Sequence, residues 1–181
     1  LHVDGAHGAS ALISKKNKNL LAGIDKANSI IWDAHKMMQV PSLCTAVLFK
    51  DFKYQAGAFQ QKGSYVFHDD EVVGMDSMPY TLECTKSALG TKLFWSFAIK
   101  GEKSMENFID QSFDLCKNFY GILKEEPDFE APFKPQSNIL CFRYIKFSKK
   151  NDFQLKLRYK IINARYFYIS SCEINNIRYL R

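Results

Sequence analysis

An aspartate and a lysine that lie far apart in the chain carry the clearest chemical signal. Asp4 lies in the segment HVDGAHG (residues 2–8), and Lys36 ends the segment SIIWDAHK (residues 29–36). A lysine amine can form a Schiff base, or aldimine, with a cofactor aldehyde. A carboxylate that faces a pyridine nitrogen keeps that nitrogen protonated, so that the ring can accept electrons from a substrate carbanion. Together the two residues predict a site for pyridoxal 5'-phosphate.

The neighbours of Lys36 suit this chemistry. His35 could donate to a cofactor phosphate, or a neighbouring backbone group could satisfy it. Residues 37–41 are apolar enough to exclude water from the amine, and Schiff-base formation requires a neutral amine. Taken alone, Asp4 could equally be a helix cap or a turn residue, and Lys36 could be an exposed surface lysine.

Composition limits the classes of protein that remain. A length of 181 residues suits one domain or a little more, and a hydrophobic content of 46% is ample for a core. The net charge of +6 raises the question of nucleic-acid binding. However, basic residues are scattered apart from short runs at 15–18 and 146–150, so we do not expect that partner. Residues 158–181 interleave basic and aromatic side chains, which a half-buried strand would also explain.

Cysteine spacing and hydropathy bear on the state of the thiols and on the cell compartment. The five cysteines are widely spaced, which predicts reduced, buried thiols. No apolar run has the roughly 18 residues that a membrane helix needs, so we expect a soluble, cytoplasmic protein. No metal site is expected, because the best candidate, residues 68–71, is more simply a charged loop. The first residues are typical of a strand already under way, so we expect the chain to be part of a longer protein.

The first part of the chain alternates strands and helices. We predict strands over residues 1–3, 29–32 and 44–49, and helices over 18–27 and 86–99. Residues 55–80 contain three glycines without a sustained apolar period, which predicts a long loop. This alternation favours an α/β layer structure.

The second part has the pattern of a smaller α+β unit. A long amphipathic helix should follow Ser104 as its cap, and a proline-rich connection should cover 125–137. Next come a strand, a helix and two further strands. Their predicted ranges are 139–144, 152–163, 166–172 and 177–180, with a turn at Asn175 and Asn176 between the last two strands. We therefore predict domains over 1–103 and 104–181.

The segments around Asp4 and Lys36 resemble the group II pyridoxal-phosphate-dependent amino acid decarboxylases. These include the glutamate, aromatic amino acid, cysteine sulfinate and diaminobutyrate decarboxylases. The resemblance spans nearly the whole chain, continuing through residues 63–67, 81–86, 135–139 and 179–181. It implies the aspartate aminotransferase-like fold of fold-type I enzymes. Residues 1–103 would be the end of the large cofactor-binding domain, and residues 104–181 most of the small C-terminal domain.

The resemblance also implies roles in cofactor binding. Lys36 would hold the cofactor as the aldimine lysine, Asp4 would face the pyridine nitrogen, and Ala6 would lie against one face of the ring. His35 would contact the phosphate. Asp33 stands where several relatives have Asn, so a direct phosphate contact there would bring two anions together.

Two further residues gain roles in catalysis and substrate binding. Tyr65 matches the mobile-loop tyrosine that protonates the substrate carbanion in the partner subunit's site, a step that a phenol can perform inside a closed pocket. Arg181 matches an arginine that meets the substrate carboxylate in glutamate decarboxylases. The implied assembly is a homodimer with a shared active site.

The predicted reaction is decarboxylation of an L-amino acid by a carboxy-lyase. Residues 33–41 look most like diaminobutyrate decarboxylases, with glutamate or a related amino acid as other candidate substrates. The family's first half supplies a ring-stacking histidine and further phosphate ligands, so we expect this segment alone to be inactive. Two alternatives stay open: another fold-type I enzyme, such as an aminotransferase or desulfurase, and a non-catalytic basic fragment that binds nucleic acid.

Overall fold

The computed structural model describes residues 1–51, 53–54, 58, 81–83 and 85–181. The chain divides into two compact units, Leu1–Asn107 and Phe108–Arg181, which are treated one at a time below. The boundary falls inside one long helix.

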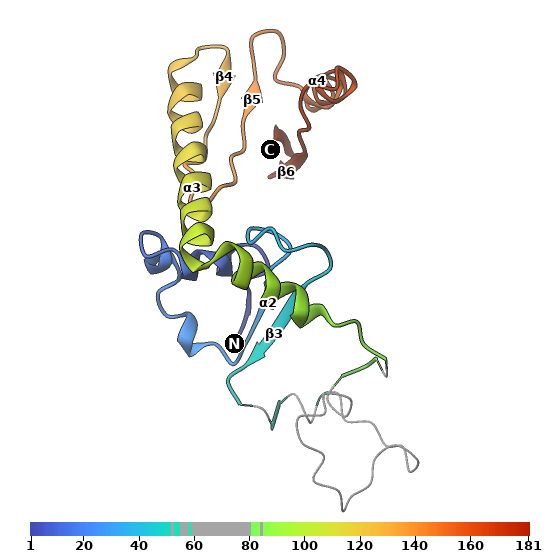
Figure 1. The fold of residues 1–181 in the computed structure, drawn as a ribbon. Coiled ribbons are helices and arrows are strands. Elements are labelled where there is room, and N and C mark those ends of the chain that lie inside the picture. Colours follow the sequence, from blue (N-terminus) through green and yellow to red (C-terminus); the bar gives the residue numbers. More distant parts are fainter. Residues whose placement is uncertain (52, 55–57, 59–80, 84) are drawn as a thin grey trace, which may run out of the picture. The chain divides into compact units, whose positions relative to one another are not determined.

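A three-stranded sheet forms the centre of the first unit, with strands in the order β1-β2-β3 (Figure 1). Strand β1 (His2–Asp4) pairs in parallel with β2 (Ser29–Asp33), and β2 pairs antiparallel with β3 (Thr45–Phe49). All three strands were predicted from their β-branched and apolar residues, and they are confirmed to within one residue. Because β1 and β2 are parallel, their carboxyl ends lie at the same edge of the sheet.

Three short 3-10 helices connect β1 to β2, namely η1 (Gly8–Ile13), η2 (Lys18–Leu21) and η3 (Ile24–Lys26). The single helix predicted over 18–27 is therefore wrong. Gly23 separates η2 from η3 with a left-handed backbone (φ 89°), which an α-helix cannot contain.

Two helices end the first unit and lead into the second. Helix α2 (Leu89–Lys100) matches the predicted helix over 86–99. Gly101, with φ 75°, separates it from α3 (Glu102–Glu125). Since α3 already begins at Glu102, the expectation that Ser104 caps it is wrong.

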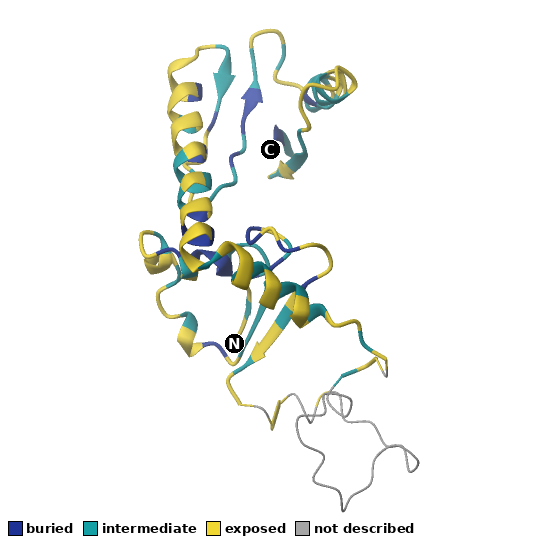
Figure 2. Ribbon diagram, in the orientation of Figure 1, coloured by how far each residue is buried: buried dark blue, intermediate teal, exposed yellow. Residues whose placement is uncertain are grey.

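The second unit packs α3 against short strands. Strand β4 (Phe129–Glu130) pairs antiparallel with β5 (Arg143–Tyr144). Only the end of the strand predicted over 139–144 is thus a strand. The buried positions of α3 that belong to this unit lie on its side toward β4 and β5 (Figure 2). The core cluster of this unit is Cys116, Leu123, Ala131, Leu140, Phe142 and Leu180.

Helix α4 (Asn151–Asn163) precedes a hairpin of β6 (Ser171–Ile174) and β7 (Ile177–Leu180). The two turn residues, Asn175 and Asn176, have φ of 51° and 61°, as a two-residue type I′ turn requires. The predicted helix, turn and last strand are confirmed.

The strand predicted over 166–172 begins five residues later than expected. Tyr166, Phe167 and Tyr168 lie outside β6, and their side chains are exposed. Their alternation therefore does not reflect a half-buried strand.

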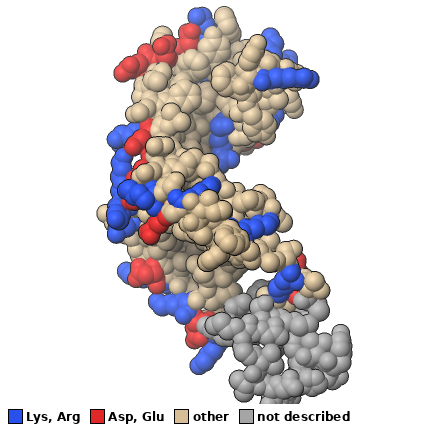
Figure 3. All heavy atoms as spheres, viewed as in Figure 1, with Lys and Arg blue, Asp and Glu red and all other residues tan. Residues whose placement is uncertain are grey.

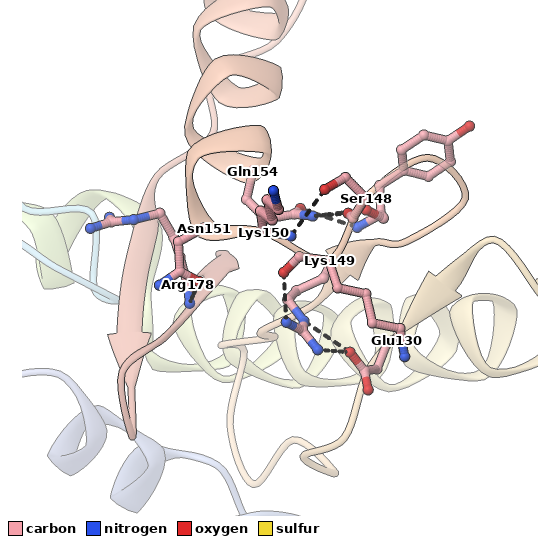
Figure 4. Close-up of polar contacts among 9 residues, drawn as sticks. Glu130, Ser148, Lys149, Lys150, Asn151, Gln154 and Arg178 are labelled. Atoms are coloured by element: carbon pink, nitrogen blue, oxygen red, sulfur yellow. Dashed lines mark hydrogen bonds and ion pairs between the residues drawn. The ribbon is translucent and has the colours of Figure 1, made fainter.

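Two polar side chains tie β5 to its surroundings (Figure 4). The side chain of Gln154, fully buried, donates from Nε2 to the carbonyl of Tyr144 at 2.8 Å, and its Oε1 accepts the Tyr144 N–H at 3.3 Å. The guanidinium of Arg143 pairs with the carboxylate of Glu130 and donates to the carbonyl of Lys149 at 3.3 Å. These contacts fix the segment between β5 and α4.

Candidate active site

The amine of Lys36 lies at the carboxyl edge of the sheet in the first unit. Strand β2 ends at Asp33, and Lys36 follows in the turn after it, with its backbone N–H bonded to the carbonyl of Asp33 at 3.1 Å. Its Nζ atom lies 2.8 Å from Oδ2 of Asp33. The amine is thus held by a carboxylate from the end of its own strand.

Asp33 is the most constrained polar residue at this edge. It is buried, and its second oxygen, Oδ1, accepts the hydroxyl of Thr45 on β3 at 2.6 Å. The hydrogen bonds from Lys36 and Thr45 hold the pKa of the Asp33 carboxyl below its usual value. The side chain is therefore an anion with both oxygens occupied.

Asp4 ends the neighbouring parallel strand. Its Oδ1 accepts the N–H of Ala6 at 3.1 Å, and the carbonyl of Ala6 accepts the N–H of Asp33 at 3.1 Å. Between them, Gly5 packs so closely that an added Cβ would lie 2.7 Å from the Cβ of Ala9. Backbone contacts through Ala6 and Asp33 thus connect the predicted ring partner with the predicted lysine.

His35 is anchored by one ring nitrogen. Its Nδ1 lies 3.0 Å from the carbonyl oxygen of Cys44 and 3.2 Å from the backbone nitrogen of Cys44. The ring nitrogen can donate to the first or accept from the second, depending on the tautomer. Nε2 takes no part in either contact. Backbone anchoring and a phosphate contact are therefore compatible, because they use different nitrogens.

The expected dry surroundings of the Lys36 amine are not present. Met37, Met38 and Val40 are buried, but the Lys36 side chain is 41% exposed and points to a carboxylate. Burial of the following residues does not carry over to the amine because the chain turns directly after it.

The remaining predicted site residues are Tyr65 and Arg181. Tyr65 and the charged segment 68–71 lie outside the described residues. Arg181 belongs to the second unit, where its backbone N–H and carbonyl both bond to the backbone of Ser170, at 3.0 and 3.1 Å. It lines a largely apolar cavity of about 540 Å³ beside α3. The backbone of this residue is thus firmly held.

Thr45 and Cys44 are site neighbours that the sequence did not indicate. Thr45 lies directly opposite Asp33 in the antiparallel register of β2 and β3. The residue types alone carried no signal, because the register of two strands is not readable from one strand.

Lysine, arginine and acidic side chains are interspersed on the face drawn in Figure 3. Within the described residues, no three His, Cys, Asp or Glu side chains gather as a metal site. In the same part of the chain, no helix has the length and apolar character needed to cross a bilayer.

Four cysteines of the described part are free thiols. Cys44 and Cys116 are buried as predicted, whereas Cys141 and Cys172 are only half-buried, with their sulfurs 3.6 Å apart. Burial and the neighbouring Cys172 raise the pKa of the Cys141 thiol to about 11, which favours the unreactive protonated form.

Solved structures with the same fold identify the fold class. The chain aligns over 99% of its length with mouse CSAD, at 22% identity and a TM-score of 0.83. It aligns over 99% with Oryza sativa TDC, solved with PLP and tryptamine, at 18% identity and a TM-score of 0.88. A third match is the glutamate decarboxylase domain of diaminobutyrate-pyruvate transaminase and L-2,4-diaminobutyrate decarboxylase from Vibrio parahaemolyticus, at 18% identity over 99% of this chain and a TM-score of 0.75. The fold is the predicted α/β fold of fold-type I.

The family follows from the sequence of most of the chain. Residues 1–145 match the pyridoxal-dependent decarboxylase conserved domain, so the chain belongs to the pyridoxal-dependent decarboxylase family. The predicted family is thereby confirmed. The chain covers 40%, 39% and 33% of the three structures above, in the order given.

Proposed function

We propose that this protein is a pyridoxal-phosphate-dependent carboxy-lyase that removes the carboxyl group of an L-amino acid. The observation that carries the proposal is the position of the Lys36 amine, beside His35 and at the same sheet edge as Asp4, in a chain of this family. In open α/β sheets, ligands bind at the carboxyl ends of parallel strands.

The residues at this edge fit the cofactor by their chemistry. When bound, pyridoxal phosphate supplies an aldehyde for an amine and a ring that withdraws electrons. We propose that Lys36 attaches the cofactor and that Asp4 keeps the ring nitrogen protonated. Ala6 offers a small side chain against the ring face. His35 would donate from Nε2 to the phosphate, a role that the anchoring of Nδ1 by Cys44 supports.

Two roles rest on the family resemblance. Tyr65 would deliver a proton to the α-carbon after carbon dioxide leaves, and Arg181 would bind a carboxylate of the substrate. Candidate substrates are L-2,4-diaminobutyrate, glutamate and related amino acids. One structural neighbour carries L-2,4-diaminobutyrate decarboxylase in its name, although the likeness at 18% identity concerns the fold.

Lys36 is tested by reduction of the cofactor onto the protein. The complete protein would be loaded with pyridoxal phosphate, reduced with borohydride and digested, and the modified peptide located by mass spectrometry. We expect the label on Lys36, its loss in Lys36→Ala, and its retention in Lys26→Ala, which removes an exposed lysine of η3. A label on another lysine of the unchanged protein would contradict the assignment.

The reaction is tested with a panel of amino acids. Release of carbon dioxide that requires Lys36 would support the proposal. Transfer of the amino group to a 2-oxo acid without carbon dioxide would instead identify an aminotransferase. Salt-dependent nucleic-acid binding that survives Lys36→Ala, without any turnover, would favour a non-catalytic protein.

We further propose a cytoplasmic homodimer in which Tyr65 acts in the partner's site. Lys36→Ala and Tyr65→Phe would each be inactive alone. If the site is shared, mixed dimers of the two variants contain one site with both an intact lysine and an intact tyrosine. Partial activity on mixing supports sharing, and its absence in verified mixed dimers contradicts it.

The domain assignment is tested by limited proteolysis. We propose that residues 1–103 belong to the large domain and 104–181 to the small one. Cleavage products that start near residue 104 and resist further digestion would support this division.

A further inference from the structure

The carboxylate of Asp33 does more at the site than end a strand. Its Oδ2 lies 2.8 Å from the amine of Lys36, and its Oδ1 is fixed by the hydroxyl of Thr45 at 2.6 Å. Since Asp33 is buried and Lys36 is half-exposed, the carboxylate is the fixed member of the pair and the lysine the movable one.

We propose that Asp33 is a positioning residue that pairs with the Lys36 amine in the cofactor-free protein and so limits how readily this amine attacks a carbonyl group. This inference rests on the proposed function, in which Lys36 is the residue that binds the cofactor aldehyde. It assigns to Asp33 a control of cofactor capture, in place of a contact with the cofactor phosphate.

The physical reason is the charge of the partner. An opposite charge within hydrogen-bonding distance favours the ammonium over the neutral amine, and only the neutral amine has the electron pair that attacks a carbonyl. Before the bond to carbon forms, the amine must give up one proton and leave the carboxylate. Asp33 cannot readily take that proton near neutral pH, because its two hydrogen bonds favour its anion.

The groups around the pair support this assignment. On β3, Thr45 contributes a neutral hydroxyl. Next to Lys36, His35 acts on the pKa of Asp33 in the same direction as the lysine and lowers it. On β1, Asp4 ends the neighbouring strand and bonds to its own turn. Within the part of the chain that the structure describes, Asp33 is thus the carboxylate that contacts the Lys36 amine.

The test measures the reactivity of Lys36 without any cofactor. The complete, cofactor-free protein would be treated with trace acetic anhydride over a range of pH, and acetylation of each lysine measured by mass spectrometry. In Asp33→Asn we expect Lys36 to be acetylated about three- to tenfold faster at neutral to mildly alkaline pH. The difference should vanish at strongly alkaline pH, where lysine amines are neutral in either protein.

Other variants separate charge from shape. Asp33→Ser removes the charge with a smaller side chain and should also accelerate acetylation, whereas Asp33→Glu keeps the charge and should restore slow acetylation. Lys92 reports on the fold, because its Nζ is held by the carbonyl of Ser42 at 3.1 Å. An unchanged rate at Lys92 excludes unfolding as the cause.

A matched ion pair serves as a control. Asp128 holds Lys146 at 2.8 Å in the second unit and raises the pKa of that lysine. Asp128→Asn should accelerate acetylation of Lys146 and leave Lys36 unchanged.

The outcomes decide the proposal independently of the enzyme's activity. If Lys36 is acetylated at the same rate in Asp33→Asn and Asp33→Ser as in the unchanged protein, while Lys146 responds to Asp128→Asn, the role of Asp33 is refuted. A second measurement follows the rise of visible absorption after mixing with pyridoxal phosphate, which should be faster in Asp33→Asn. Failure of the unchanged protein to bind pyridoxal phosphate would refute the proposed function, but the acetylation rates would still decide the role of Asp33.

Discussion

The hydroxyl of Thr45 donates to Oδ1 of Asp33 at 2.6 Å, across the antiparallel pair of β2 and β3. This contact ties the end of the strand that leads to Lys36 to the strand beside it. It therefore stabilises the sheet and positions the candidate site at once.

Replacing Thr45 by Val should destabilise the protein measurably. Val has nearly the same shape but no hydroxyl, so the buried Asp33 carboxylate loses one hydrogen bond. A hydrogen bond to a charged group contributes about 1.5–3 kcal/mol, so we expect a loss of that size in the free energy of unfolding. Urea unfolding measures it. Thr91→Val, at an exposed position of α2, should change stability by less than about 0.5 kcal/mol. Equal effects of the two substitutions would contradict the role of Thr45.

The contribution of Asp33 to stability should depend on acid pH. Its pKa is lower in the folded protein than its usual value of 3.8, so the unfolded chain binds a proton more readily. The stabilisation is therefore fully present above about pH 4 and is lost as the pH falls through the folded pKa. The pKa of Glu106 is also lowered in the folded protein. This shift is present both in the unchanged protein and in Asp33→Asn, so it cancels when the two are compared. The difference in unfolding free energy between these two proteins should shrink below about pH 4. A difference that grows there would show that the shift has the opposite sign.

Gly5→Ala should disrupt the packing of β1 against its neighbours. The new Cβ would lie 2.7 Å from the Cβ of Ala9 and 3.0 Å from the carbonyl oxygen of Ile31. Overpacking of this kind costs about 1–3 kcal/mol, which thermal or urea unfolding can measure. Gly8→Ala is the control, because a Cβ there meets nothing within 4 Å. If Gly5→Ala is as stable as Gly8→Ala, the close packing of Gly5 against Ala9 is refuted.

Gln154→Leu should destabilise the second unit. The substitution keeps the volume of the buried side chain but leaves the N–H and carbonyl of Tyr144 without the partners that Gln154 provides. We expect a loss of roughly 2–4 kcal/mol for the two groups. Gln111→Leu, at an exposed position of α3, provides the comparison and should cost little. Equal stability of the two variants would mean that water replaces Gln154 without cost.

The sequence predicted the elements whose signal is local. Ile30 and Ile31 fill β2 with β-branched side chains, and the two asparagines between β6 and β7 tolerate a positive φ, so both features were readable. The helix expected over 18–27 failed because Gly23 takes a left-handed conformation, which periodicity does not reveal. The strand expected over 166–172 began too early because the exposed aromatic residues at 166–168 have the same alternating pattern as a strand.

The candidate site was predictable in its residue types but not in its contacts. Lys36, His35 and Asp4 follow from the segments that resemble the family. The partners of Asp33 and His35 depend on the register between β2 and β3, which distant parts of the chain set together. The ion pair of Lys36 was missed because the apolar residues after it suggested a water-poor amine.

The parallel pairing of β1 and β2 has a consequence for how this part of the chain can vary. Neighbouring strands lie about 4.8 Å apart whatever connects them. Helices η2 and η3, which contain no buried residues, could therefore be lengthened or shortened without altering the distance between the ends of the strands. Insertions there should be tolerated, whereas a one-residue shift in the pairing of the two strands would displace Lys36 relative to Asp4.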